Sequence, residues 1–284
     1  HVLRSGATPV FVDCSPDTWN MDIAEVEAAL TDRTKAIIVV HIYGLPADID
    51  KVVEIAKAHN IAVIEDSAEA HGQNLEGKAL GSFGTLSTFS FYSNKLITTG
   101  EGGMVLTSDT ALADKVRSLR NLSFDPQRRF VHERLGWNYR MTAMQAALGL
   151  SQLSRMSDLL AYKQEVGRHY QKGMRDWVNV TRPIEQHRGS ENVYWVFGLV
   201  LPEDHRLSAK AAMESLGKKG IGTRPFFYPL HQQPLLEKYG LAKQRPLPVS
   251  EWLGGQGFYL PNGAGLTQSQ LDYIMENVQT VIGA

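Results

Sequence analysis

One lysine, Lys95, follows an apolar, strand-like segment and precedes a glycine-rich turn. The sequence runs Ser90-Phe91-Tyr92-Ser93-Asn94-Lys95 and continues into Thr98-Thr99-Gly100-Glu101-Gly102-Gly103. A lysine beside small, flexible residues suits a Schiff-base nucleophile, because its amine must reach into a cleft that bulky backbone leaves open. Taken alone, the pattern favours a solvated surface lysine, since most lysines are exposed.

A carboxylate at the end of a second predicted strand changes this balance. Asp66 follows the apolar run 61–64 and Glu65, and it precedes the small-residue segment 67–72. Pyridoxal phosphate (PLP) needs a carboxylate on its protonated ring nitrogen, because that pair keeps the ring an electron sink. An isolated aspartate here could be a cap or turn residue. Together, the two segments favour a PLP site anchored on Lys95.

The elements that must position these residues form a strand–helix–strand unit. The β-branched run 36–40 predicts a buried strand, a helix follows from Asp48, and the run 61–64 predicts a second strand. This spacing indicates a parallel sheet, with its site at the carboxyl ends of the strands. Further predicted strands are 9–13, 86–91, 103–107 and 193–201. Predicted helices are 110–121, 142–170 with a bend near 154–157, 208–219 and 268–281.

The expected fold is α/β, with a mostly parallel large domain over residues 1–155 and a smaller α+β domain over residues 156–284. The 284 residues carry a net charge of −1 and no basic stripe, which argues against nucleic acid as a partner. The longest apolar stretch falls far short of the roughly 20 residues that a membrane span needs. A single cysteine, Cys14, excludes an internal disulfide and fits a cytoplasmic location.

The sequence gives little support for a nucleoside-triphosphate site, a nicotinamide site or a metal site. The segment from Gly72 to Ala79 is close to a P-loop, but Ala79 stands where a Ser or Thr must bind Mg²⁺. No Gly-x-Gly-x-x-Gly follows an early strand, and the nine histidines show no metal-ligand spacing, so we expect no metal. His41, His59 and His71 are interpreted as turn, surface or site-rim residues.

The ordered motifs resemble the DegT/DnrJ/EryC1/StrS family of sugar-nucleotide aminotransferases, which have the type I fold of PLP-dependent transferases. The resemblance extends over essentially the whole chain, and the segment 224–231 is most similar to perosamine synthase-like 4-aminotransferases. The motifs that carry it are 6–13, His41-Ile42-Tyr43-Gly44, 65–72, 89–95, 136–141, 224–231 and Leu260-Pro261.

The resemblance assigns roles by position. It implies that Lys95 binds PLP covalently and moves protons, that Asp66 pairs with the ring nitrogen, and that Ser90 contacts the phosphate. Glu69 matches a position beside the phenolic oxygen that is often Gln in relatives, so it would need a proton or another partner there. The remaining implied positions are Asn138, which reaches the cofactor phosphate of a neighbouring subunit, Tyr139 beside it, and Arg224 and His231 near the sugar-nucleotide cleft.

The resemblance implies a homodimer with shared active sites that transfers an amino group from glutamate to a nucleotide-linked 4-keto-6-deoxy sugar. The product would serve a surface polysaccharide or a glycosylated compound. Lys95 argues against the family's sugar 3-dehydratases, which have histidine at this position. Relatives carry roughly 80 or more residues before the point where this sequence begins, including a Gly-Thr turn that binds the cofactor phosphate. The alternative is therefore an inert PLP-binding fragment or a regulatory relative.

Overall fold

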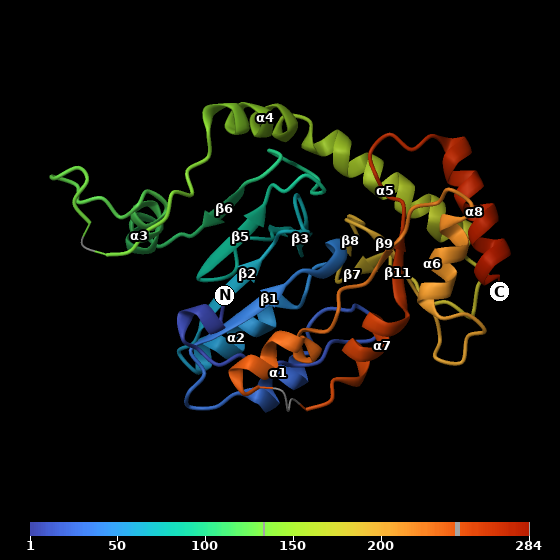
Figure 1. Ribbon diagram of the computed structural model, residues 1–284, viewed down its shortest axis with the longest axis horizontal. Helices are drawn as coiled ribbons and strands as arrows, with labels where there is room; N and C mark the ends of the chain where they lie inside the picture. The colour runs from blue at the N-terminus through green and yellow to red at the C-terminus, as the bar shows by residue number, and fades with distance from the viewer. Residues whose placement is uncertain (133, 242–244, 284) are drawn as a thin grey trace.

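The predicted strand–helix–strand unit is present in the computed structural model, which describes residues 1–132, 134–241 and 245–283. It consists of β1 (Ala36–Val40), α2 (Ile49–Ala58) and β2 (Ala62–Asp66). The two strands are parallel, with Val40 opposite Asp66. Next to β2 lies β5 (Leu86–Ser90), also parallel, and β6 (Gly103–Leu106) is antiparallel to it. The sheet order is therefore β1-β2-β5-β6, mostly parallel as expected (Figure 1).

One face of this sheet packs on helices. Ile37 and Val39 of β1 are buried with Val52 of α2 and Val26 of α1 (Ile23–Ala29). On the opposite face, Ile38 and Val40 remain exposed. Because the apolar residues of α2 recur at helical spacing, one stripe of the helix enters the core. This packing fixes the carboxyl ends of β1, β2 and β5 at one edge of the sheet.

The long helix predicted over 142–170 is divided at the predicted bend. α4 (Ala143–Leu153) begins with a capping box between Thr142 and Gln145, and α5 (Met156–Gly173) follows after Ser154 and Arg155. Figure 1 shows α4 and α5 in succession along one side of the molecule, from the four-stranded sheet to the smaller sheet. α3 (Thr110–Arg120) lies at the far end of the larger part.

The second half of the chain surrounds a three-stranded antiparallel sheet of order β10-β11-β9. Its strands are β9 (Phe197–Val200), β10 (Arg224–Pro225) and β11 (Gly257–Leu260). Its main helices are α6 (Ala209–Gly217), α7 (Pro248–Gln256) and α8 (Gln268–Ile282), and α6 and α8 share a core with α5. A domain boundary between residues 155 and 156 stays a prediction.

Short elements complete the fold. They are the hairpins β3 (Asn74–Leu75) with β4 (Lys78–Ala79) and β7 (Gln186–His187) with β8 (Ser190–Glu191), and the 3-10 helices η1 (Leu3–Ser5), η2 (Ile42–Gly44), η3 (Leu230–Gln232) and η4 (Pro234–Tyr239). In the described part of the chain, no helix combines the length and hydrophobicity needed to cross a membrane.

Two predicted strands differ from the structure. The prediction over 9–13 is wrong, because this segment joins no sheet and Asp13 instead accepts hydrogen bonds from the amides of Val249 and Ser250 at the start of α7, at 3.0 and 2.9 Å. The strand predicted over 193–201 begins only at Phe197. Before it, Tyr194 has a φ of 45°, and its amide donates to Asn192 Oδ1 at 2.7 Å, so the backbone turns there.

Candidate active site

Asp66 and Ser90 lie at the same edge of the four-stranded sheet. Asp66 ends β2 and is the register partner of Thr88 in β5, and Ser90 ends β5 two residues later. Asp66 Oδ1 accepts a hydrogen bond from the Ala68 amide at 3.0 Å. In the part of the chain that the structure describes, no donor bonds to Asp66 Oδ2. One carboxylate oxygen at this sheet edge is therefore available for a ligand.

Lys95 lies between a carboxylate and an aromatic ring. Its Nζ is 3.6 Å from Glu69 Oε1 and 4.0 Å from the centroid of the Trp195 ring. The side chain is 11 % exposed, so the amine is sheltered but can be reached. A turn after β5, closed by the Lys95 amide donating to the Tyr92 carbonyl, directs it there. An amine in this setting is oriented by two attractive partners.

The carboxyl group of Glu69 is buried, and its pKa is raised. It is 7 % exposed, and its Oε2 accepts a hydrogen bond from the Tyr43 amide at 2.9 Å. Burial raises its pKa to about 7 against the opposing effects of the Tyr43 amide and Lys95, and the charge of Asp66 raises it further. Near neutral pH, a large fraction of Glu69 is therefore protonated. A protonated carboxyl can donate to a phenolic oxygen, as the amide of a glutamine would.

Sequence reasoning assigned no role to two aromatic residues of the site. Tyr43 is buried and has a φ of 56°, and its ring stacks on that of Trp195 with centroids 6.2 Å apart. Gly44 permits this approach, since a Cβ there would lie 2.7 Å from the Trp195 amide nitrogen. Tyr43 lies in the motif His41-Ile42-Tyr43-Gly44, and this motif was the sequence signal that could have placed it in the site. For Trp195, about 100 residues from Lys95 along the chain, no local pattern pointed to the site.

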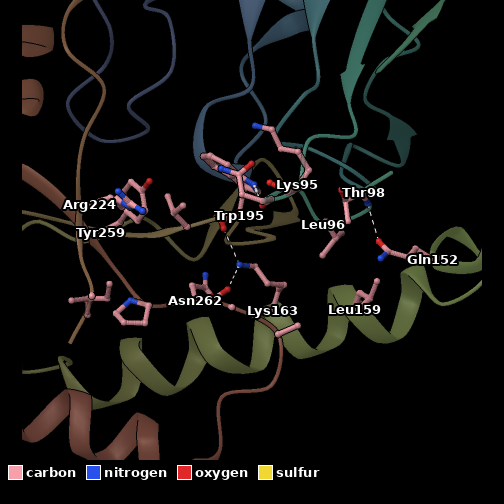
Figure 2. Close-up of a pocket in the computed structure, with 18 of the residues that line it drawn as sticks. Lys95, Leu96, Thr98, Gln152, Leu159, Lys163, Trp195, Arg224, Tyr259 and Asn262 are labelled. Carbon is pink, nitrogen blue, oxygen red and sulfur yellow. Dashed lines mark hydrogen bonds between the residues drawn. The ribbon is translucent and has the colours of Figure 1, made fainter. Parts of the chain in front are cut away.

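A cavity of about 590 Å³ opens beside Lys95. Four of its lining residues are basic, namely Lys95, Arg155, Lys163 and Arg224, and no carboxylate of the described residues lines it. Figure 2 shows Lys95, Trp195 and Arg224 on one side and residues of α5, including Leu159 and Lys163, on the other. Asp66, Glu69 and Ser90 lie outside this lining. The cavity suits an anionic ligand that reaches Lys95 from the side of the smaller sheet.

The predicted site residues His231, Asn138 and Tyr139 do not line the cavity beside Lys95. His231 is buried outside the cavity lining, and its Nε2 is 2.9 Å from Glu251 Oε1. Asn138 and Tyr139 lie on the exposed segment between α3 and α4, where Tyr139 is 72 % exposed. Asn138 Oδ1 accepts a hydrogen bond from Arg140 Nε at 2.9 Å. A role for Asn138 in a neighbouring subunit's site stays a prediction.

The residues present fit the groups of PLP. Lys95 supplies the amine, Asp66 has a free oxygen for the ring nitrogen, and Glu69 can hold a proton for the phenolic oxygen. The fully buried Ser67 hydroxyl beside Asp66 has no partner among the described residues. Across those same residues, no cluster of His, Cys, Asp or Glu could hold a metal ion. This fold and donor set define the class of PLP-dependent transferases.

Comparison with known proteins identifies the family within the PLP-dependent transferases. The family model for the DegT/DnrJ/EryC1/StrS aminotransferase family matches residues 1–279. GDP-perosamine synthase of Caulobacter vibrioides is 43 % identical over 99 % of this chain and 75 % of its own length. GDP-perosamine synthase of Escherichia coli O157:H7 is 39 % identical over 98 % of this chain and 74 % of its own.

A solved structure extends the match to three dimensions. Helicobacter pylori PseC, an aminotransferase involved in the biosynthesis of pseudoaminic acid, superposes with a TM-score of 0.92 at 28 % identity, over 99 % of this chain and 75 % of its own. The chain belongs to the DegT/DnrJ/EryC1/StrS aminotransferase family, and it is a PLP-dependent enzyme. The expectations for fold class, family and cofactor are confirmed.

Proposed function

We propose that the protein transfers an amino group from glutamate to a nucleotide-linked 4-keto-6-deoxy sugar, in the synthesis of an amino sugar for surface polysaccharide or a glycosylated product. The observation that carries the proposal is the position of Lys95, which lies between Glu69 and Trp195 and also lines a cavity to which the described residues contribute no carboxylate. Relatives named GDP-perosamine synthases favour GDP as the nucleotide and C4 as the aminated carbon.

Each site residue has a distinct task in this proposal. When bound, PLP supplies the electron sink that allows an amino group to move between two carbon skeletons. Asp66 Oδ2 would pair with the protonated ring nitrogen, and protonated Glu69 would donate a hydrogen bond to the phenolic oxygen. Lys95 Nζ anchors the cofactor and then accepts and returns a proton at the reacting carbon. Ser90, half-buried at the end of β5, would bind the phosphate through its hydroxyl.

The cavity would hold the sugar nucleotide. A pyrophosphate needs cationic donors, and Arg155 and Arg224 line the cavity that Lys95 also lines. A guanidinium group binds two phosphate oxygens at once, whereas a carboxylate in the wall would repel a phosphate. Arg224 lies on β10, opposite Tyr259 of β11, so the small sheet fixes its backbone. His231 does not line this cavity, so its predicted place near the sugar-nucleotide cleft stays a prediction.

We also propose a homodimer with shared active sites. The segment with Asn138 and Tyr139 is exposed, and helix α4 beside it buries none of its side chains. Exposed apolar side chains extend over this region, including those of Leu135, Trp137, Met144 and Leu150. Exposed apolar side chains in this number support an interface in which Asn138 reaches a partner's cofactor phosphate. The cytoplasmic location stays a prediction.

The test uses the full-length protein incubated with PLP. We expect a visible absorption band from the lysine-bound cofactor, loss of the band on adding glutamate, and its return on adding a GDP-linked 4-keto-6-deoxy sugar. Matching dTDP- and UDP-linked sugars in parallel reactions identify the nucleotide. A band that glutamate does not change would contradict the proposal and favour the alternative of a non-catalytic PLP-binding relative. Lys95→Arg, which keeps the charge, provides the control without a band.

A further inference from the structure

Helix α5 carries a buried lysine, Lys163, that lines the cavity. Lys163 is 8 % exposed, and its Nζ donates to the carbonyls of Trp195 at 2.8 Å and of Asn262 at 2.5 Å. Burial lowers its pKa to about 7, and no carboxylate of the described chain contributes to that value. An unpaired buried charge is costly. Its two hydrogen bonds therefore indicate a task for Lys163 beyond filling space.

The hydrogen bond from Lys163 to the Trp195 carbonyl connects Lys163 to Lys95, because the Trp195 ring contacts the Lys95 amine. Lys163 holds the backbone carbonyl of Trp195, and the indole Nε1 of Trp195 donates to the Asn94 carbonyl at 3.3 Å. Between these two attachments, the face of the indole lies 4.0 Å from Lys95 Nζ. Figure 2 shows Lys163 reaching from α5 toward Trp195 and Asn262, with Lys95 beside Trp195. The backbone and the ring of Trp195 are thus both fixed.

Two glycines pack closely against residues 194–195, Gly167 against the Tyr194 ring and Gly44 against the Trp195 backbone. Gly167 lies one helical turn after Lys163, on the same face of α5, and a Cβ there would lie 2.3 Å from Tyr194 Cδ2. From the larger part of the molecule, a Cβ on Gly44 would lie 2.7 Å from the Trp195 amide nitrogen. These contacts keep the Tyr194 ring and the Trp195 amide close to α5 and to Gly44, and the hydrogen bond from Lys163 holds the Trp195 carbonyl between them.

We propose that Lys163 is a positioning residue for the reaction at Lys95: by holding the Trp195 backbone, it keeps the indole face against the Lys95 amine. A ring face attracts an ammonium group and orients it, and it does so only at a fixed distance and angle. The cofactor must meet this amine in a defined orientation. This role rests on the proposed function, since it concerns the same lysine.

The test is a double-mutant cycle with cofactor uptake as the readout. Lys163→Met keeps the approximate volume and removes the charge and the donors. Trp195→Leu removes the ring. The apo-protein is mixed with PLP, and growth of the visible band gives the uptake rate. We expect each single variant to lower the rate about tenfold and the double variant to be no slower than the slower single variant, because the two residues act in series.

The matched control is Lys172→Met, an exposed lysine on the same helix, which should leave the uptake rate unchanged. Unchanged uptake in folded Lys163→Met, or additive effects in the double variant, would overturn the proposal. If Lys163→Met does not fold, Lys163→Gln takes its place in the cycle, because its side chain is shorter and uncharged. Lys163→Gln should slow PLP uptake in the native background. It should not slow uptake further in the Trp195→Leu background. Equal slowing in both backgrounds, or none in either, overturns it.

The readout separates this proposal from the proposed function. Uptake of PLP by Lys95 does not require glutamate or a sugar nucleotide. If native protein forms the visible band but transfers no amino group, the proposed function fails, and the cycle still decides the role of Lys163. If native protein forms no band, both fail.

Discussion

Replacing Glu69 by glutamine should change the pH dependence of stability in a defined window. Glu69 is 7 % exposed, and its pKa rises from 4.5 to about 7 on folding, chiefly through burial. Between these pH values the folded protein keeps a proton that the unfolded chain has released. The free energy of unfolding therefore falls as pH rises through this window. Glutamine has nearly the same shape and cannot ionise, so Glu69→Gln removes this loss.

The size of the effect follows from the same two values. A rise from 4.5 to about 7 corresponds to about 3 kcal/mol at about 1.4 kcal/mol per pH unit. Relative to the native sequence, Glu69→Gln should be nearly neutral at pH 4.5 and more stable by up to about 3 kcal/mol at pH 8. The Tyr43 amide keeps an acceptor in the variant, because the glutamine carbonyl can replace the carboxylate oxygen.

The assay is urea unfolding of the cofactor-free protein at a series of pH values, with the two proteins compared at each. Glu54→Gln, on the exposed face of α2, controls for the loss of one negative charge. Its difference from the native protein should not change across the same window. A Glu69→Gln difference that is constant from pH 4.5 to pH 8 would show that Glu69 titrates alike in the folded and unfolded states, contrary to this prediction.

Three further substitutions test separate parts of the structure. Lys95→Ala should abolish both the visible band and amino transfer, and wild-type turnover would remove Lys95 from its role. Asp66→Asn should lower kcat on the order of a hundredfold and weaken PLP binding, as measured by steady-state kinetics and cofactor titration; an unchanged rate would exclude Asp66 from the site. Gly167→Ala places a Cβ 2.3 Å from Tyr194 and should lower the free energy of urea unfolding by about 1–3 kcal/mol. Gly217→Ala, where a Cβ meets open space, should cause no loss and is its control.

The sequence was most informative where local pattern and burial agree. The β-branched run of β1 and the apolar stripe of α2 have periods that match their elements, so both were predicted within a residue or two. The bend between α4 and α5 was also found, because apolar spacing weakens there. The segment 9–13 has the composition of a strand, yet its partner is the start of α7, which no local signal indicates.

The site was predictable in part for the same reason. Asp66 and Lys95 each follow a recognisable strand, and parallel strands bring such residues to one edge. Trp195 and Lys163 reach this edge from the second half of the chain through tertiary packing. Their positions depend on Gly44 and Gly167, whose contacts appear only once the chain has folded. The protonation of Glu69 likewise depends on burial, which the sequence alone does not specify.

The proposed function depends first on Lys95 as the residue that binds the cofactor. The most direct measurement is borohydride reduction of the full-length protein with PLP, followed by proteolysis and mass spectrometry of the peptides. We expect one phosphopyridoxyl group, attached to Lys95, and none when the protein is first treated with glutamate and freed of unbound cofactor. Attachment at another lysine, or no attachment at all, would contradict the account.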